Sequence, residues 1–317
     1  HHKMVGGRVL FTDSTHLKAN ANKHQFTRET VKVETREYVE ELDKAIEEDR
    51  AAHGKKPLKK KEEEEETKEI RISTTDPDCG FMSRDNKQEM FCYLDHRTTD
   101  MKFNIITDAF VTPGNVHDSV PYLSRLDRQI ERFQFKVEAV ALDSGYLTNP
   151  ICKGIIDRNI FGVIAHRRYS PVKGLFPKWK FTYDQKADWY TCPNGETLTY
   201  RTTNREGYRE YKSSAKQCKD CPLLSQCTRS KNQVKVVTRH VWEENKEKIR
   251  LNRLSKSGKV LYKFRKEKVE RSFADSKELH GLRYCRLRGI KKAAEQVLLT
   301  AACQNIKKIA MHLSKIG

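Results

Sequence analysis

The chain has 317 residues, of which 37% are hydrophobic and 33% charged, and its formal net charge is +19. No apolar run approaches the ~20 residues of a membrane-spanning helix, and the first residues lack a signal-peptide pattern. Nine cysteines, an odd number, do not favour the disulfide framework of a small secreted domain. We therefore expect a cytoplasmic protein with mostly reduced cysteines, no membrane partner, and one large domain or two smaller ones.

The positive charge is concentrated in one part of the chain. Residues Lys246–Lys292 contain 17 Lys or Arg and 5 Asp or Glu, a net charge of +12. A concentrated positive charge of this kind is typical of a segment that binds a polyanion, because each contact with a phosphate releases counterions and so favours binding. Nucleic acid is the favoured partner, and an acidic protein or a membrane surface is the alternative.

The first part of the chain predicts strands separated by a charged segment. Arg8–Thr12 is a short apolar run typical of a buried strand. Apolar residues at helical spacing predict a helix from about 34 to 50, and 55–69 is a low-complexity charge run best explained as solvated. Met90–Leu94 and Ile105–Val111 are two further predicted strands.

Alternating helices and strands follow. A turn at 112–115 precedes a predicted helix over 116–133, and 137–142 (VEAVAL) is the clearest predicted strand. A short helix near 150–158 leads to another buried strand over 160–165. Strand–helix–strand order of this kind predicts an α/β sheet with parallel members.

The rest of the chain is divided between an insertion and helices. Short β-like stretches, aromatic residues and a cysteine cluster predict a small β-rich insertion over 166–245. Helices are expected over 259–280 and 290–312, the latter with an apolar side of Ala294, Val297, Leu298, Ala301, Ile306 and Ile309. The predicted organisation is a core of 1–20 and 70–165, a charged insertion over 21–69, the β-rich insertion, and C-terminal core helices over 246–317.

Two predicted strands end alike, in FTDST around Asp13 and in ALDSG around Asp143. An Asp at the end of a buried parallel strand lies where an α/β sheet opens toward its ligand-binding edge. Taken singly, either Asp is as readily a helix cap or a turn former. Together, in a basic protein, the two carboxylates predict a site for hard divalent cations, which prefer oxygen ligands.

A third carboxylate is expected from the helix over 259–280. On a helix, Glu270 and Lys277 share one face, and Arg265 lies within two turns upstream on the same surface. This spacing brings a carboxylate beside phosphate-binding cations. Two alternatives stay open: an ordinary ion pair of Glu270 with Lys266, and a site built on Glu267 instead.

A cysteine cluster lies in the predicted β-rich insertion. Cys192 stands in CPNG, and Cys218, Cys221 and Cys227 follow as C-x₂-C-x₅-C. Four cysteines can bind Zn²⁺ tetrahedrally and staple an insertion that lacks its own core. An iron–sulfur cluster and free thiols are the alternatives, because Cys192 lacks a close partner. Nearby candidates for nucleic-acid contacts, or for a local core and solvated surface, are Tyr208, Tyr211, Lys212 and Lys216.

Six stretches, in this order, carry a resemblance to a known family. They are FTDSTHLKANANK (11–23), STTDPDCGFMSR (73–84), YLDHRTTD (93–100), VTPGNVHDS (111–119), ALDSGY (141–146) and YKFRKEKVERSFADSKELHGLRYCRLRG (262–289). Through them the chain resembles bacterial insertion-sequence DDE transposases. The resemblance implies an α/β fold with an RNase H-like mixed sheet flanked by helices. It carries the family's catalytic Asp, Asp and Glu onto Asp13, Asp143 and Glu270.

The resemblance also implies an activity. The three carboxylates would hold Mg²⁺ (or Mn²⁺) for DNA cleavage at transposon ends and for strand transfer. The family's Tyr–Arg–Glu–Lys signature falls on Tyr262, Arg265, Glu270 and Lys277. The gap between its Arg and Glu is one residue longer than usual, which leaves Lys266 as the alternative to Arg265. Arg271 is a further candidate for contacting DNA phosphates.

The implied partners are double-stranded DNA and further copies of the chain, as a homodimer or larger assembly, in association with the bacterial nucleoid. Family members usually carry a helical DNA-binding region ahead of the first strand, so we expect this chain to be a fragment. The alternatives to a transposase are an inactive DNA-binding remnant and an RNase H-like nuclease. Four residues near the predicted site are expected mainly to structure loops: Asp76, Asp78, His117 and Asp118.

Overall fold

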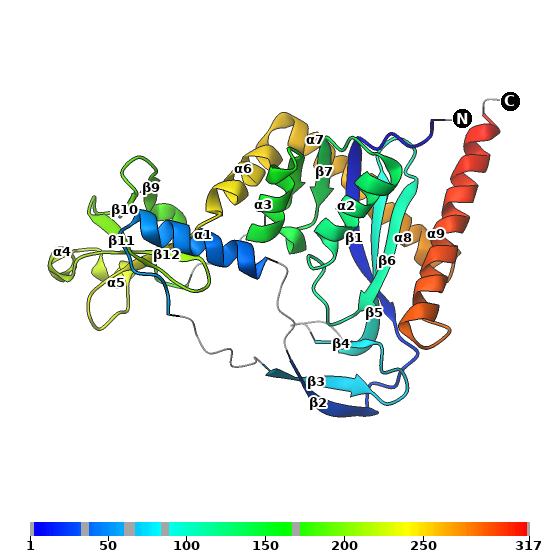
Figure 1. Ribbon diagram of the computed structural model, residues 1–317, viewed down its shortest axis with the longest axis horizontal. Coiled ribbons are helices and arrows are strands. Elements are labelled where there is room, and N and C mark those ends of the chain that lie inside the picture. Colours follow the sequence, from blue (N-terminus) through cyan, green and yellow to red (C-terminus); the bar gives the residue numbers. More distant parts are fainter. Residues whose placement is uncertain (1–2, 33–37, 60–66, 84–88, 167–171, 316–317) are drawn as a thin grey trace. The chain divides into compact units, whose positions relative to one another are not determined.

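The computed structural model describes residues 3–32, 38–59, 67–83, 89–166 and 172–315. The chain divides into two compact units (Figure 1). Unit 1 combines residues 1–33, 65–166 and 245–317, and unit 2 combines 34–64 with 167–244. Each unit has its own multi-stranded sheet.

Unit 1 is built on a mixed sheet with the strand order β4-β5-β1-β7-β8, and β6 also pairs with β5. β1 is antiparallel to β5 and parallel to β7, and β8 continues the parallel side. The strands are β1 (Val9–Lys18), β4 (Gly80–Met82), β5 (Met90–Asp100), β6 (Ile106–Pro113), β7 (Ala139–Leu142) and β8 (Phe161–Ile164). The predicted α/β sheet with parallel members is confirmed.

Two strands of this sheet are about twice as long as predicted. β1 continues to Lys18, and β5 continues to Asp100. The two strands pair from Leu10 opposite Asp100 to Lys18 opposite Cys92. The added residues are mostly polar, so an apolar run does not identify them, although those of β5 are buried. Asp13 therefore lies within β1 and not at its end, which corrects the prediction.

Helices cover both faces of the sheet. Because side chains alternate along a strand, Phe11 and Ala141 point to the face opposite their neighbours. These two residues pack against Val269 and Phe273 of the C-terminal helical segment. On the other side lie α2 (Tyr122–Phe133) and α3 (Asn149–Asp157), in front of the sheet in Figure 1, while α8 is behind it.

The C-terminal helical segment is α6 (Glu243–Leu254), α7 (Lys256–Arg265), η3 (Lys266–Glu270), α8 (Arg271–Leu279) and α9 (Ile290–Leu313). α7 begins after Ser255, whose hydroxyl accepts a hydrogen bond from the amide of Gly258 at 3.1 Å. The helix then continues without a break through η3 into α8, and η3 is one turn of π-helix. The helix predicted over 259–280 is confirmed, but its π-turn was not predicted.

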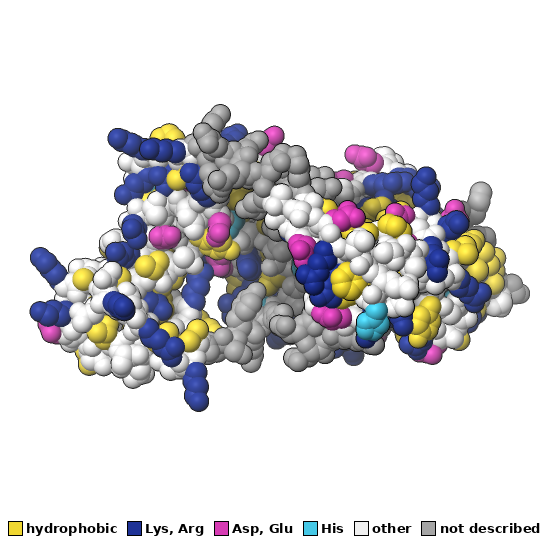
Figure 2. Space-filling view, turned by 90° about the horizontal axis from the view of Figure 1, so that it is seen from below, with side chains coloured by type: hydrophobic (Ala, Val, Ile, Leu, Met, Phe, Trp, Pro, Cys, Tyr) yellow, Lys and Arg dark blue, Asp and Glu magenta, His cyan; other side chains and the backbone are white. Residues whose placement is uncertain are grey.

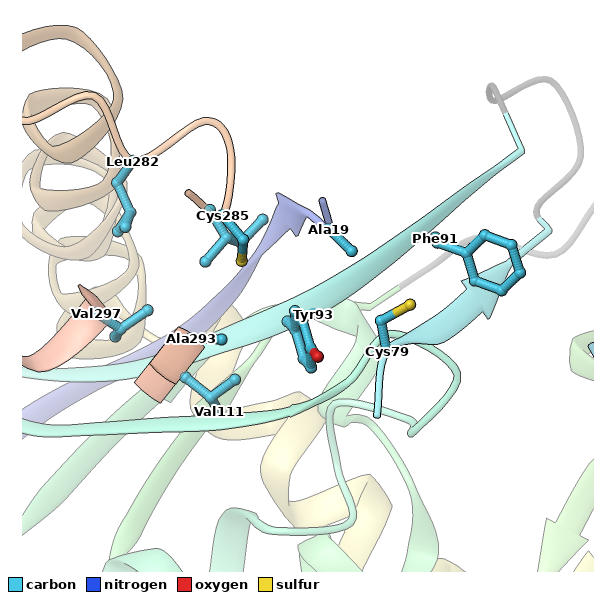
Figure 3. Packing of buried hydrophobic residues seen from close by; sticks show 10 residues of the cluster. Ala19, Cys79, Phe91, Tyr93, Val111, Leu282, Cys285, Ala293 and Val297 are labelled. Carbon is cyan, nitrogen blue, oxygen red and sulfur yellow. The ribbon is translucent and has the colours of Figure 1, made fainter. Parts of the chain in front are cut away.

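One hydrophobic cluster joins the sheet to α9 and the loop before it. Figure 3 shows side chains of Tyr93 and Val111 from the sheet approaching Ala293 and Val297 of α9, with Cys285 between them and Leu282. All of these residues are buried. This cluster fixes the end of the chain onto the same sheet face as η3.

The apolar side predicted for α9 is partly wrong. Val297 and Ala301 are buried, but Leu298 and Ile306 are 52% and 64% exposed. The buried stripe includes Gln304 instead, whose side-chain amide donates to the Ser272 carbonyl at 2.9 Å. A hydrogen-bonded glutamine on the buried side rotates the helix away from the face that hydropathy alone predicts. Among the described residues no helix, α9 included, is long and apolar enough to cross a membrane.

The charged segment near the N-terminus contains a two-stranded ribbon that was not predicted. β2 (Phe26–Lys32) pairs antiparallel with β3 (Thr67–Ser73). Both strands mix charged and β-branched residues without an apolar run or a strict alternation, so the strand pattern is weak. Residues 60–66 of the predicted charge run lie outside the described residues.

Unit 2 is an antiparallel sheet in the order β13-β12-β11-β10-β9. Its strands are β9 (Thr182–Asp184), β10 (Trp189–Thr191), β11 (Thr197–Thr203), β12 (Tyr208–Lys212) and β13 (Val236–His240). Its buried cluster is Phe181, Tyr190, Leu198, Tyr211 and Val237. Short helical turns complete it: η2 (Lys178–Lys180), α4 (Ala215–Lys219) and α5 (Leu224–Cys227). Residues 166–245 are thus β-rich, as predicted.

A helix from the first charged segment, α1 (Val39–Ala52), completes unit 2. Asp49 of this helix is buried and pairs with Arg209 at 2.6 Å. His53 contacts Asp188 at 2.7 Å. The helix predicted from about 34 is described from Val39 onward. Polar contacts between segments more than 100 residues apart along the chain therefore join α1 to the β-rich part.

Candidate active site

The two predicted aspartates reach the same region from neighbouring strands. Phe11 of β1 lies opposite Ala141 of β7 in the parallel register, and Asp13 and Asp143 each follow two residues later. A two-residue step keeps a side chain on the same face of a sheet. β7 ends at Leu142, and the Asp143 carboxylate accepts the Ser144 amide at 2.6 Å, capping the short helix η1 (Ser144–Tyr146).

The helix with Glu270 is fixed across these strands. Val269 of η3 and Phe273 of α8 are buried against Phe11 and Ala141. Glu270 follows Val269 directly and is 46% exposed at its side chain. The packing of Val269 and Phe273 therefore sets the position of Glu270 relative to the two aspartates.

Arg265 links the helix carboxylate to the strand carboxylate. Its Nη2 lies 2.6 Å from Oδ2 of Asp13, and its Nη1 donates to Oε1 of Glu270 at 2.8 Å. The Arg265 side chain is only 3% exposed. Burial acts to lower the pKa of Arg265, but the negative charges of Asp13, Asp143 and Glu270 help to raise it above its ordinary value. One buried cation therefore bridges two of the acidic groups and is influenced by the charge of the third.

The carboxylate of Asp13 has a raised pKa. Burial raises the pKa of Asp13 to about 6, against the opposing effects of Arg265 and the Ser14 amide. The neighbouring charges of Asp143 and Glu270 raise it further. Asp13 and Asp143 follow paired residues of β1 and β7, and Arg265 contacts both Asp13 and Glu270, so the three carboxylates lie in one region. Glu267, the competing carboxylate in sequence, is exposed.

The other residues of this helix that were predicted to bind phosphate have different surroundings. Lys277 donates to the hydroxyl of Thr15 at 2.6 Å, two residues beyond Asp13 on β1. The Tyr262 ring lies 4.1 Å from the guanidinium carbon of Arg253. Lys266 and Arg271 are exposed. Arg265, predicted as a phosphate contact, is instead bound to protein carboxylates in this structure.

Comparison with known families gives one match. Residues 191–310 match the family model described as a transposase DDE domain. This part of the chain is similar to a transposase DDE domain. The matched residues include Arg265 and Glu270, whereas Asp13 and Asp143 precede them. No curated protein and no solved structure matched the chain.

The matched residues 191–310 also contain the four clustered cysteines. All four are free and partly buried. Burial raises the pKa of Cys227, and the proximity of Cys192, Cys218 and Cys221 raises it further, against the effect of Lys235. Cys227 is thus within electrostatic range of the other three thiols, although the four side chains are not arranged around a common metal position in the described structure. Two hydrogen-bonded turns hold them, from the Cys221 amide to the Cys218 carbonyl (3.2 Å) and from Gly195 to Cys192 (2.9 Å).

Asp76 and Asp78, two of the four residues expected to structure loops, anchor helix α9. The buried Asp76 carboxylate accepts hydrogen bonds from the Tyr93 hydroxyl at 2.8 Å and from the Gly289 amide at 3.0 Å. Asp78 accepts from the amide of Ile290 at 2.9 Å. Gly289 has φ of +91°, which a glycine adopts without strain. Both aspartates therefore structure a loop, as expected.

Asp118 lines a small cavity beside the site, with His96, Tyr122 and Tyr146 among its other walls. In each of these four side chains one buried polar atom has no hydrogen-bond partner within the described residues. Buried polar groups of this kind usually bind an internal water. His117, by contrast, contacts the Ser119 hydroxyl at 2.7 Å on the surface.

A buried ion pair that was not predicted holds α8 on the sheet. Arg97 of β5 is fully buried and pairs with Asp95 at 2.5 Å. Its other terminal nitrogen donates to the hydroxyls of Ser272 (3.0 Å) and Ser276 (2.7 Å). Charged residues at alternate positions of a strand ordinarily indicate a solvated face, so no sequence signal marks this pair.

The carboxylate cluster has the chemistry of a divalent-metal site. Within the described ranges no three His, Cys, Asp or Glu side chains are arranged around a common metal position. At the carboxylate cluster the guanidinium of Arg265 lies between Asp13 and Glu270. Carboxylate oxygens are the ligands that Mg²⁺ and Mn²⁺ prefer, and here they already surround a cation. The residues present therefore fit such a metal in type and charge.

Proposed function

We propose that this chain is the catalytic part of a transposase that cleaves DNA at transposon ends and joins them to target DNA. The observation that carries the proposal is the convergence of Asp13, Asp143 and Glu270 on one buried cation. The strand order supports an RNase H-like fold, because three antiparallel strands are extended by two parallel ones. The family match supports DNA as the substrate.

In this proposal Asp13, Asp143 and Glu270 hold Mg²⁺ or Mn²⁺. Such ions, when bound, supply Lewis-acid stabilisation of the phosphodiester and a more acidic nucleophile. The strands β1 and β7 and the helix through η3 orient the carboxylates. Exposed cations of the same helix, Lys266 and Arg271, contact phosphates of double-stranded DNA. Assembly of two or more copies on DNA is part of the proposal.

A strand-transfer assay with a matched pair of variants tests this function. A labelled transposon end is incubated with plasmid, Mg²⁺ and the full chain. Glu270→Gln removes the carboxylate at the cluster, whereas Glu267→Gln removes an exposed carboxylate one turn earlier. We expect Glu270→Gln to lower joining at least about a hundredfold, because removing a group essential to the metal site costs that much or more. Glu267→Gln keeps parental joining.

Three outcomes would contradict the proposal. Joining by Glu270→Gln at the parental rate would remove Glu270 from the site. Cleavage without joining would indicate a nuclease. DNA binding without either reaction, in a chain whose carboxylates are intact, would indicate a non-catalytic DNA-binding protein.

A further inference from the structure

We propose that Arg265 is a resting-state counter-ion. In the metal-free protein its guanidinium occupies the carboxylate cluster, and it releases Asp13 and Glu270 when divalent cations bind. This inference rests on the proposed function only in taking Asp13, Asp143 and Glu270 as the metal ligands. It assigns to Arg265 a role inside the protein, in place of the phosphate contact that sequence suggests.

Arg265 makes the contacts of a cation that bridges carboxylates. Its two terminal nitrogens bridge carboxylates from different elements, Asp13 at 2.6 Å and Glu270 at 2.8 Å. The side chains of Arg265 and Asp13 are 3% and 17% exposed. Carboxylates brought together with so little water repel one another unless a cation lies between them. Arg265 supplies this cation in the metal-free state.

The shape of the helix explains how Arg265 reaches this place. Arg265 and Glu270 are five residues apart, and in an α-helix five steps leave two side chains about 140° apart around the axis. The π-turn η3 lies between them and closes hydrogen bonds over five residues, so it brings residues five apart onto one face. The extra residue in the signature is therefore accommodated by the π-turn, with Arg265 still facing Glu270.

Few other contacts oppose the release of Arg265. Its Nε is buried and has no hydrogen-bond partner among the described residues. The guanidinium is thus held chiefly by the two carboxylates that a metal would take. The Tyr262 ring, 5.7 Å from the guanidinium carbon, offers a face that attracts a cation. Metal and guanidinium compete for the same oxygens.

The proposal is tested by Mn²⁺ binding to the full chain in the absence of DNA. Calorimetry compares the parent with Arg265→Gln, which removes the charge, and with Lys263→Gln, which removes an exposed charge from the same helix. We expect Arg265→Gln to bind Mn²⁺ at least about tenfold more tightly, since a hydrogen bond between charged groups changes an equilibrium by about that factor. Lys263→Gln keeps the parental affinity. Equal or weaker binding by Arg265→Gln would overturn the proposal.

A second measurement uses the parent chain and does not depend on a variant that folds. In ¹⁵N-labelled protein the Nη–H signals of Arg265 should shift and lose exchange protection when Mg²⁺ is added. Unchanged signals at saturating Mg²⁺ would contradict release. If Asp143→Asn and Glu270→Gln leave Mn²⁺ affinity intact, the metal-ligand assignment of the proposed function fails. If Asp143→Asn and Glu270→Gln abolish Mn²⁺ binding but Arg265→Gln does not strengthen it, the metal-ligand assignment stands and only the counter-ion role of Arg265 is contradicted.

Discussion

The pKa of the Asp13 side chain is determined by the elements that surround it. It lies in the middle of β1, and the helix through η3 covers its face of the sheet. Burial raises its pKa to about 6 from an ordinary value of 3.8, although Arg265 opposes the shift. A carboxylate of this kind is stabilised in its neutral form unless a cation lies beside it.

The raised pKa of Asp13 predicts a pH-dependent stability. Because the folded-state pKa exceeds the unfolded one, the stabilisation from Asp13 is complete below about pH 4 and is lost as pH rises through about 6. The free energy of unfolding of the metal-free parent, relative to Asp13→Asn, should fall by about 3 kcal/mol from pH 4 to 7. Urea denaturation at a series of pH values measures it. If the free energies of unfolding of parent and Asp13→Asn changed with pH in parallel, this prediction would be contradicted. Asp43→Asn, which removes an exposed carboxylate, is the control.

At the scale of the element, the π-turn η3 predicts how the helix tolerates changes in length. Deleting Lys266 leaves Arg265 four residues from Glu270, and an ordinary α-helix aligns such residues. Inserting one alanine after Lys266 makes the spacing six, which one π-turn cannot absorb. We expect the deletion to keep Mn²⁺ affinity within about threefold. The insertion separates Arg265 from Glu270 and should therefore strengthen Mn²⁺ binding at least about tenfold, as Arg265→Gln does. Equal affinities for both would show that the π-turn has no such role.

The cysteine segment of unit 2 is a second element with its own prediction. Residues 214–236 contain no buried side chain, so this segment has no hydrophobic core of its own. A zinc ion bound by the four cysteine thiols would stabilise this segment, and zinc binding stays a prediction. The purified chain should contain about one zinc per molecule, and Cys221→Ser should lose it and become protease-sensitive in this segment. Cys303→Ser, an exposed cysteine elsewhere, keeps the metal. A purified parent chain that contains no zinc would contradict this prediction.

The elements found from sequence are those that local patterns determine. β7, β8, α2 and α3 have apolar runs or helical spacing within a few residues of chain. The full lengths of β1 and β5 depend on their pairing across about 80 residues, and a local pattern does not contain that information. The ribbon of β2 and β3 was missed for the same reason.

The site was predictable to different degrees. Asp143 follows the clearest strand, so the sequence places it well. Asp13 was predicted at the end of a strand, but its strand does not end there, and its role in the site stays a prediction. Spacing left Glu267 and Glu270 as alternatives, and the structure distinguishes them by the packing of Val269 and the contact of Glu270 with Arg265. The bridging role of Arg265 depends on the π-turn, for which the sequence offered only an unexplained extra residue.

At the scale of the whole molecule, charge is the dominant property. On the face shown in Figure 2, Lys and Arg side chains project across unit 2, at left, with few Asp or Glu among them. The net charge of +19 is distributed over both units, and Lys246–Lys292 alone contributes +12. A surface of this kind binds DNA mainly through phosphates and therefore through counterion release.

This charge predicts a steep dependence of DNA binding on salt. If six or more phosphates are contacted, affinity for double-stranded DNA should fall about a thousandfold between 50 and 200 mM salt. Fluorescence anisotropy with a labelled duplex measures it, and Lys266→Gln and Arg271→Gln should each reduce the slope by about one. Binding that is insensitive to salt would contradict the assignment of these residues and of the basic surface as a whole.

The central claim is that Asp13, Asp143 and Glu270 form one metal site, and anomalous diffraction tests it most directly. Crystals of the chain with a DNA end and Mn²⁺ should show two anomalous peaks about 3.5–4 Å apart, bound by all three carboxylates. Arg265 should no longer bridge Asp13 and Glu270. Mn²⁺ bound elsewhere, or an intact bridge of Arg265 in crystals saturated with Mn²⁺, would contradict the account.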